Sequence, residues 1–355
     1  MYKIDPARLS AHATALTEDP SSTATASTYA ADHMTLEILD TSFVYSKAMF
    51  AANETVEALQ SYFTALNTAL TASATELEGT ATRSLELDDA IEAELDREYP
   101  DAGTSPGPTT PAGDASSGSV HNAVDELTPP ATEVPEDLVA TILTTDWLSP
   151  SSALAQVLDW IFDWDYLDVI AKNFSGDWNK LYEVSDALKH LGAYTRVQGD
   201  NVRHEMAVTA GSWSGEAATA ANAFFTDMAD NLRDAGTKIA ELGPEFEAVS
   251  RGMISTASLV SDVFAKILDA ALVAAICIAA GTVSIETIVG GILGYLCGGV
   301  EIGYALWLAK SAYDTVQSVI TFFDALNASV GVLSSLLAGG ADLPVPAGCD
   351  NAQVS

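Results

Sequence analysis

The chain has 355 residues, 48% of them hydrophobic, so it is long enough to bury a large core and to form about two units. Its 49 acidic and 15 basic residues give a formal net charge of −34, and a surface of that sign repels phosphate backbones, which argues against a nucleic-acid partner. Cys277, Cys297 and Cys349 are odd in number and lack ligand spacing, which excludes a disulfide framework and a zinc site.

The first eight residues contain no apolar segment of the kind found in a secretory signal peptide. We therefore expect the protein either to stay in the cytoplasm or to leave the cell by a route that recognises folded structure.

Residues 1–99 predict a first helical hairpin. Asp5 followed by Pro6 suits a helix start, Pro20 interrupts that helix, and a longer helix is expected after Ser42. The longer helix carries an apolar stripe at the spacing of an amphipathic helix, and it ends in a charged stretch. The stripe consists of Leu59, Phe63, Leu66, Leu70, Ser73 and Leu77.

Residues 100–137 are expected to be a disordered acidic linker. They hold seven of the chain's thirteen prolines together with Gly, Ser and Thr, and they include no Lys or Arg. Such a composition buries too little apolar surface to fold, so at most a short helical turn is expected at 121–127.

Residues 138–262 predict an aromatic lead-in helix followed by a second hairpin. Both arms of this hairpin carry apolar residues every three or four positions, and a kink is expected at Pro244 in the second arm. The aromatic residues of the lead-in are Trp147, Trp160, Phe162, Trp164 and Tyr166, which favour a packing helix over a ligand site.

The bend of the second hairpin has the sequence Gly-Ser-Trp-Ser-Gly-Glu at positions 211–216. Gly215 tolerates a positive φ or a close backbone approach, and Glu216 suits the first turn of the next helix. Trp213 is a large ring in a short connection. One interpretation is that Trp213 simply fills the corner between two helices.

A helix–Trp-x-Gly–helix hairpin also resembles the WXG family of small proteins exported by the type VII secretion system. The resemblance implies that Trp213 and Gly215 form one half of a composite export signal. The other half would come from the first hairpin, packed against the second within the chain, or from a co-expressed partner of the same type. The two interpretations of Trp213 are compatible.

The start Ile4-Asp5-Pro6, followed by Leu9, resembles the Esp-type substrates of the same export systems. The C-terminal signal of these families is Tyr-x-x-x-Asp/Glu, and the corresponding place in the first hairpin has Ser84 and Asp88, a degenerate form with Ser in place of Tyr. The literal match, from Tyr182 to Asp186, precedes the Trp-x-Gly bend, and we interpret it as a coincidence.

Residues 263–338 contain two uncharged apolar runs, at 270–285 and 287–300, and then an amphipathic helix expected to cover them. Gly290, Gly294 and Gly298 recur at a spacing that permits close helix contact. Each run is shorter than the roughly 20 residues of a membrane span. A buried helical hairpin and a membrane-inserting hairpin both remain open, and residues 339–355 are expected to be a loose tail.

No nucleotide-binding loop or nucleophile–base pair is recognisable. His204 and Glu205 begin like a metalloprotease helix, but Val208 stands where the second histidine is required, and the acidic residues are expected on solvent faces. The sequence thus predicts an all-α, non-enzymatic protein without metal or cofactor.

As the resemblance implies, the protein is expected to be a substrate of the type VII machinery, located outside the cell or on its surface. The alternatives are an exported effector that inserts residues 263–310 into a membrane, and a cytoplasmic adaptor or partner of a type VII toxin.

Overall fold

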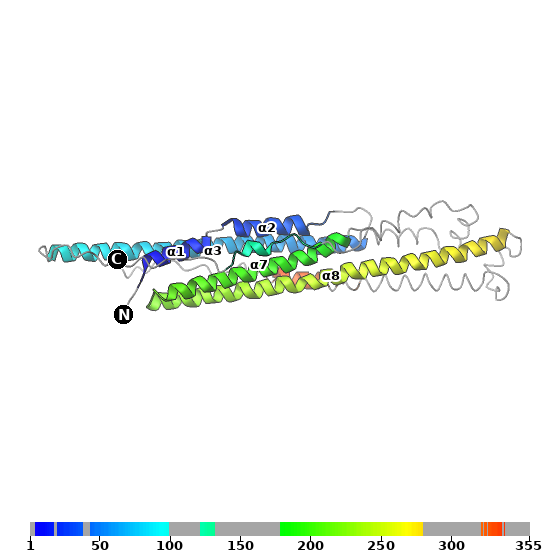
Figure 1. Ribbon diagram of the computed structural model, residues 1–355. Helices are drawn as coiled ribbons and strands as arrows, with labels where there is room; N and C mark the ends of the chain where they lie inside the picture. The colour runs from blue at the N-terminus through cyan, green and yellow to red at the C-terminus, as the bar shows by residue number, and fades with distance from the viewer. Residues whose placement is uncertain are drawn as a thin grey trace.

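The computed structural model describes residues 4–17, 20–37, 43–98, 121–131 and 178–279, together with residues 321, 323–324, 326–335 and 337. Every named element in these residues is helical, and they form an elongated bundle (Figure 1). The all-α prediction is therefore confirmed for the described part of the chain. The elements are α1 (Pro6–Thr17), α2 (Pro20–Met34), α3 (Phe43–Glu98), the short 3₁₀ helix η1 (Ala123–Glu126), α7 (Trp178–Ala210) and α8 (Glu216–Ala279).

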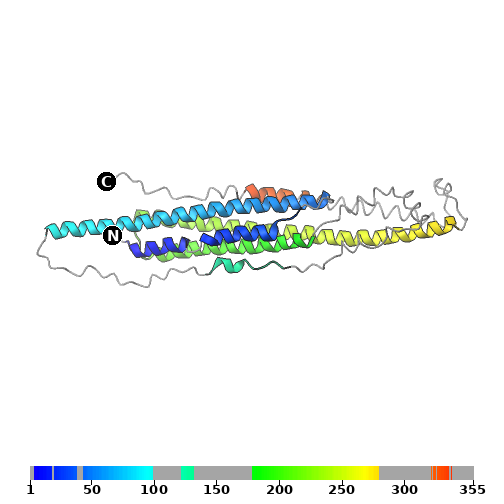
Figure 2. The ribbon, with the colours of Figure 1, turned by 90° about the horizontal axis from the view of Figure 1, so that it is seen from above.

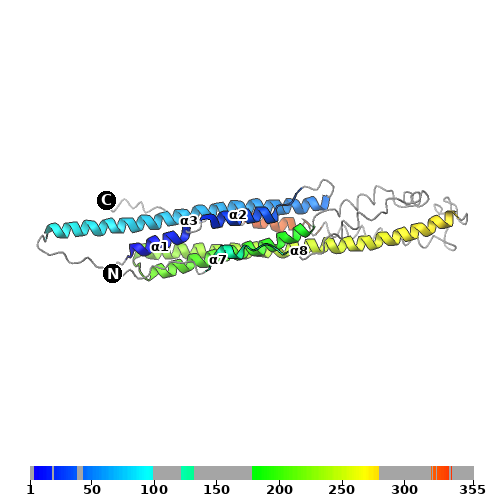
Figure 3. The ribbon, with the colours of Figure 1, turned by 45° about the horizontal axis from the view of Figure 1, so that its top comes forward.

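The N-terminal hairpin has its first arm divided into α1 and α2. Helix α1 begins at Pro6 because Asp5 caps it, with Asp5 Oδ1 accepting a hydrogen bond from the Arg8 backbone N–H at 3.3 Å. Helix α2 begins at Pro20, the residue predicted to interrupt the first helix. Both helices pack on α3, which returns in the opposite direction (Figure 3).

Helix α3 buries the predicted apolar stripe. Leu59, Phe63 and Leu66 are at most 1% exposed, and Ser73 donates its hydroxyl to the carbonyl oxygen of Ala69, which satisfies its polar group inside the core. The C-terminal part of α3 extends beyond the rest of the bundle (Figure 2), and most of its described side chains are exposed from residue 82 onward.

Helices α7 and α8 form the second hairpin and lie side by side along the length of α7 (Figures 1 and 2). Helix α8 continues through Pro244 and across residue 262 without ending. The boundary that the sequence placed between the second hairpin and the apolar region therefore falls inside one continuous helix. No helix among the described residues combines the length and apolar character needed to cross a bilayer.

The contact between α7 and α8 is made by small residues that repeat every seven positions. On α7 these are Ser185, Gly192 and Gly199, and they face Gly243, Gly236 and Ala229 on α8. A Cβ atom added to Gly192 would lie 2.5 Å from the carbonyl oxygen of Gly236, and one added to Gly243 would lie 2.7 Å from that of Ser185. The two backbones therefore approach more closely than ordinary side chains permit.

The N-terminal hairpin packs against α7 of the second hairpin. The Tyr194 hydroxyl lies 2.6 Å from the Ser22 hydroxyl, and the Tyr194 ring meets Phe63 edge to face at 5.7 Å. Near the opposite end of the contact, the ring of Tyr45 on α3 packs edge to face against Trp178 at 5.3 Å. Buried aromatic pairs of this geometry stabilise an interface beyond their apolar area.

Residues 121–131 are an ordered part of the expected disordered linker, and the short helical turn expected at 121–127 is η1. This segment lies against α2 and α7, and Ala123 is 3% exposed. Tyr29 donates its hydroxyl to the Thr128 carbonyl oxygen at 2.7 Å, and the Ala131 backbone N–H donates to Asp186 at 2.8 Å. Tertiary hydrogen bonds hold a segment whose own composition does not favour folding.

The described helical residues between 321 and 337 belong to the expected amphipathic helix, and they bury Phe323, Leu326 and Val330. They contact α3 and α7, because Asp324 accepts from Lys47 at 2.7 Å and Phe323 packs near Trp178. The apolar runs that this helix is expected to cover lie outside the residues whose side chains the structure describes.

Several predictions fall on residues outside those the structure describes. They concern the remaining linker at 100–120 and 132–137, the aromatic lead-in at 138–177, the glycines Gly290, Gly294 and Gly298, and the tail at 339–355.

Candidate functional site

The Trp-x-Gly bend is a tight connection between the end of α7 and the start of α8. The backbone N–H groups of Gly211 and Ser212 donate to the carbonyl oxygens of Val208 and Thr209, which closes the last turn of α7. Gly215 has φ of 121° and its carbonyl oxygen accepts the first hydrogen bond of α8, from the Thr219 N–H at 3.0 Å. A side chain at position 215 would be strained, so the bend requires glycine there.

Trp213 lies inward in this bend and is 7% exposed. Its indole Nε1 is buried and has no hydrogen-bond partner among the described residues. A buried indole N–H usually finds a hydrogen-bond partner. Because this N–H is buried without one, the protein is less stable than it would be if the indole donated a hydrogen bond. The ring fills the corner of the hairpin, in agreement with the packing interpretation and without conflict with the export interpretation.

Helix α1 docks beside the bend through a buried ion pair. Arg8 Nη2 donates to Glu205 Oε2 at 2.8 Å, and both side chains are at least 93% buried. The expectation that acidic residues lie on solvent faces is wrong for Glu205. A buried charge without its partner raises the free energy of the folded state, so the ion pair favours this one position of α1 on α7.

His12 extends the same buried cluster toward α8. Its Nδ1 lies 3.1 Å from the Thr209 hydroxyl, and its ring packs 4.8 Å from that of Phe225. Burial and the nearby Arg8 guanidinium lower the pKa of His12 to about 4, so the ring is neutral near neutral pH. The sequence contained one signal for this cluster, since Glu205 lies on the same helical face as Val202 and Thr209.

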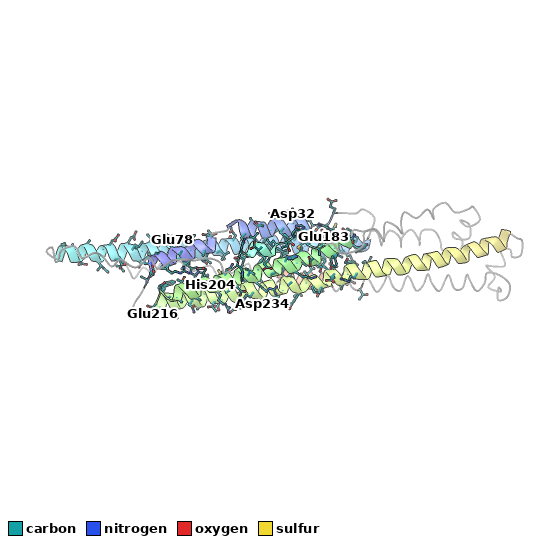
Figure 4. All side chains as sticks on the ribbon, in the orientation of Figure 1. Asp32, Glu78, Glu183, His204, Glu216 and Asp234 are labelled. Atoms are coloured by element: carbon teal, nitrogen blue, oxygen red, sulfur yellow. The ribbon has the colours of Figure 1, made fainter. Side chains whose placement is uncertain are left out.

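The degenerate signal on α3 lies at the same end of the molecule as the Trp-x-Gly bend. Figure 4 labels Glu216, which starts α8, and Glu78, which precedes this part of α3, at that end of the bundle. Asp88 is exposed and Ser84 is half-buried. The structure thus places these two segments at the same end of the bundle.

Tyr182 and Asp186, which match the Tyr-x-x-x-Asp/Glu pattern on α7, make contacts within the protein. Asp186 accepts a hydrogen bond from the Ala131 backbone N–H, its Oδ2 lies 3.3 Å from His190 Nε2, and the Arg251 guanidinium lies over the Tyr182 ring at 5.8 Å. These contacts give both residues a structural role in holding α7 to its neighbours.

Within the described ranges, no group of three or more His, Cys, Asp or Glu side chains is arranged to hold a metal ion. No protein-family model, curated protein or solved structure matches this chain.

Proposed function

We propose that the protein is a non-enzymatic substrate of a type VII secretion system and acts through its helical surfaces. The observation that carries the proposal is the bend at Trp213 and Gly215. It joins two long antiparallel helices, buries the tryptophan and uses a glycine with φ of 121°. These features accord with the WXG-type hairpin that the sequence resembles.

The first hairpin, in this proposal, takes the place of a separate partner. Its support is the contact between α1 and the end of α7, where Arg8, Glu205, His12 and Thr209 are all buried. A hairpin held in this way leaves little of that α7 surface for a second protein. The protein would then be exported as one folded chain with both halves of its signal.

The test is the amount of protein in the culture supernatant of its native host. Export should be lost in a strain without the type VII export ATPase and in a Trp213→Ala variant. Trp213→Phe keeps an aromatic ring in the corner of the hairpin, so this variant should stay closer in stability to the original protein than Trp213→Ala. It therefore separates the packing role of the ring from recognition of the indole by the export machinery. Phe224→Ala is a matched control, since Phe224 is an aromatic residue of α8 that is only partly buried.

Normal thermal stability with loss of export in Trp213→Phe would support recognition of the indole itself. Protein confined to the lysate of every strain, including the original, would contradict the proposal and favour an intracellular adaptor. Export that survives Trp213→Ala would remove this residue from the signal.

A further inference from the structure

A cavity of about 300 Å³ lies between the end of α1, the start of α2 and the neighbouring faces of α3 and α7. Its wall comes from α1, α2, α3, η1 and α7, so both hairpins and the 121–131 segment contribute. This volume is at the lower end of the roughly 300–1,000 Å³ typical of small-molecule sites.

The wall is polar where the helix pattern would place apolar side chains. Gln198 and Glu205 lie on the face of α7 that also carries Tyr194 and Val202, and Asn67 lies on the face of α3 that carries Phe63 and Leu70. Polar groups at such positions raise the free energy of the folded state unless they find partners. Their presence indicates a cavity built for hydrogen bonding.

Two of these amides use one end in hydrogen bonds within the protein. Asn67 Oδ1 accepts from Thr23, and Gln198 Nε2 donates to Ser22 at 2.7 Å and to Tyr194 at 3.1 Å. These bonds orient both amides. Asn67 Nδ2 and Gln198 Oε1 have no recorded hydrogen bond within the described part of the chain, which provides one donor and one acceptor in the same cavity.

The described lining of the cavity favours an uncharged ligand. None of the described lining residues is Lys or Arg, and a chain of net charge −34 repels anions. Among these residues the carboxylate of Glu205 is 2% exposed and already paired with Arg8, so it offers no uncompensated charge to a cation. Leu16, Leu70 and Val202 add apolar surface suited to the faces of a sugar ring.

We propose that this cavity binds an uncharged, hydroxyl- and amide-bearing molecule of monosaccharide size. The ligand bridges Asn67 of α3 and Gln198 of α7 and therefore ties the first hairpin to the second. This site goes beyond export and does not depend on it.

The test uses the full chain and N-acetylglucosamine as the probe, with saturation-transfer NMR to detect binding and thermal unfolding to detect stabilisation. Ala15→Leu inserts a larger side chain into the cavity and should weaken binding at least tenfold. Thr14→Leu is the matched control, because it adds the same side chain one position away on the exposed face of α1. Asn67→Ala is a second variant that removes the donor without filling the space, and circular dichroism establishes that each variant is folded.

Binding to the original chain and to Thr14→Leu, with loss in Ala15→Leu or in Asn67→Ala, supports the site. Absence of saturation transfer at millimolar probe means that the cavity holds water only and overturns the proposal. Equal binding in all variants overturns it as well, since the probe would then lie elsewhere. Preferential stabilisation by methylammonium or phosphate overturns the assignment to an uncharged ligand.

Discussion

Gly192 of α7 and Gly236 of α8 face each other so closely that a Cβ atom on either would lie within 2.6 Å of the other's carbonyl oxygen. The same approach recurs one heptad away in both directions, between Gly199 and Ala229 and between Gly243 and Ser185. The second hairpin is therefore held by backbone proximity as well as by its apolar stripe. Close packing increases the dispersion contacts available to the flanking side chains.

Gly192→Ala should destabilise the protein by about 1–3 kcal/mol, because the added methyl group overpacks a contact with backbone atoms that cannot move away locally. The measurement is the free energy of unfolding in urea. Gly252→Ala is the matched control on α8, where nothing lies within 4 Å of the added Cβ. It should stabilise the protein by about 0.5–1 kcal/mol through helix propensity. Equal effects of the two changes would contradict the close approach.

Gly215→Ala should cost about 1–3 kcal/mol, because an L-residue is strained at φ of 121°. Gly211→Ala provides the comparison in the same connection, since Gly211 has no positive φ and a Cβ atom added to it would lie 3.3 Å from the Val208 carbonyl oxygen. Both variants lose the flexibility of a glycine, but only Gly215→Ala places a side chain at a positive φ. Comparing the thermal unfolding of the two variants therefore isolates the effect of backbone strain. A smaller effect at 215 than at 211 would be inconsistent with the strained conformation.

Removing one partner of the Arg8–Glu205 pair should be more harmful than removing both. Arg8→Met leaves the Glu205 carboxylate buried without its partner and should cost about 3–5 kcal/mol. The double variant Arg8→Met with Glu205→Leu should recover most of that loss, since no charge then remains buried. A double-mutant cycle of unfolding free energies measures the coupling, and simple additivity would argue against a direct buried interaction.

Stability should fall as the pH falls from about 6.5 to 4, in part because of His12. The pKa of this ring is lowered to about 4 in the folded protein, against an ordinary value of 6.5, first by burial and then by Arg8. Between these values the unfolded chain binds more protons, so acidification favours unfolding by up to about 3 kcal/mol. The contribution is fully present above pH 6.5 and lost toward pH 4.

His12→Leu should flatten this part of the pH profile, whereas His204→Gln should not, because His204 is exposed on α7. Urea unfolding at several pH values provides the comparison. A profile unchanged by His12→Leu would mean that other groups, such as His33 with its lowered pKa, account for the pH dependence.

Local sequence signals predicted the helices well, and tertiary contacts account for what they missed. The proline positions and apolar stripes located the starts of α1 and α2 and the buried face of α3. The heptad of small residues was not recognised, because Gly192 and Gly236 count as gaps in an apolar period. Their importance lies in what the opposite helix brings near them.

The 121–131 segment and the buried ion pair also depend on tertiary contacts that local sequence signals do not reveal. Nothing in the composition around Ala123 predicts that Tyr29 and Asp186, distant in sequence, supply its hydrogen-bond partners. Arg8 and Glu205 are 197 positions apart, so only the three-dimensional arrangement reveals their pairing. The Trp-x-Gly bend, by contrast, depends on local geometry, and Gly215 has the positive φ that its position in the sequence permits.

The two longest helices are offset along the bundle, with α3 extending past one end and α8 past the other (Figure 2). At about 1.5 Å per residue, the 56 residues of α3 span about 84 Å and the 64 residues of α8 about 96 Å. A single 37.1 kDa chain with this shape has a large frictional coefficient. It should therefore leave a gel-filtration column as early as a much heavier globular protein. Its elution volume would overstate the mass, and light scattering would give the true value.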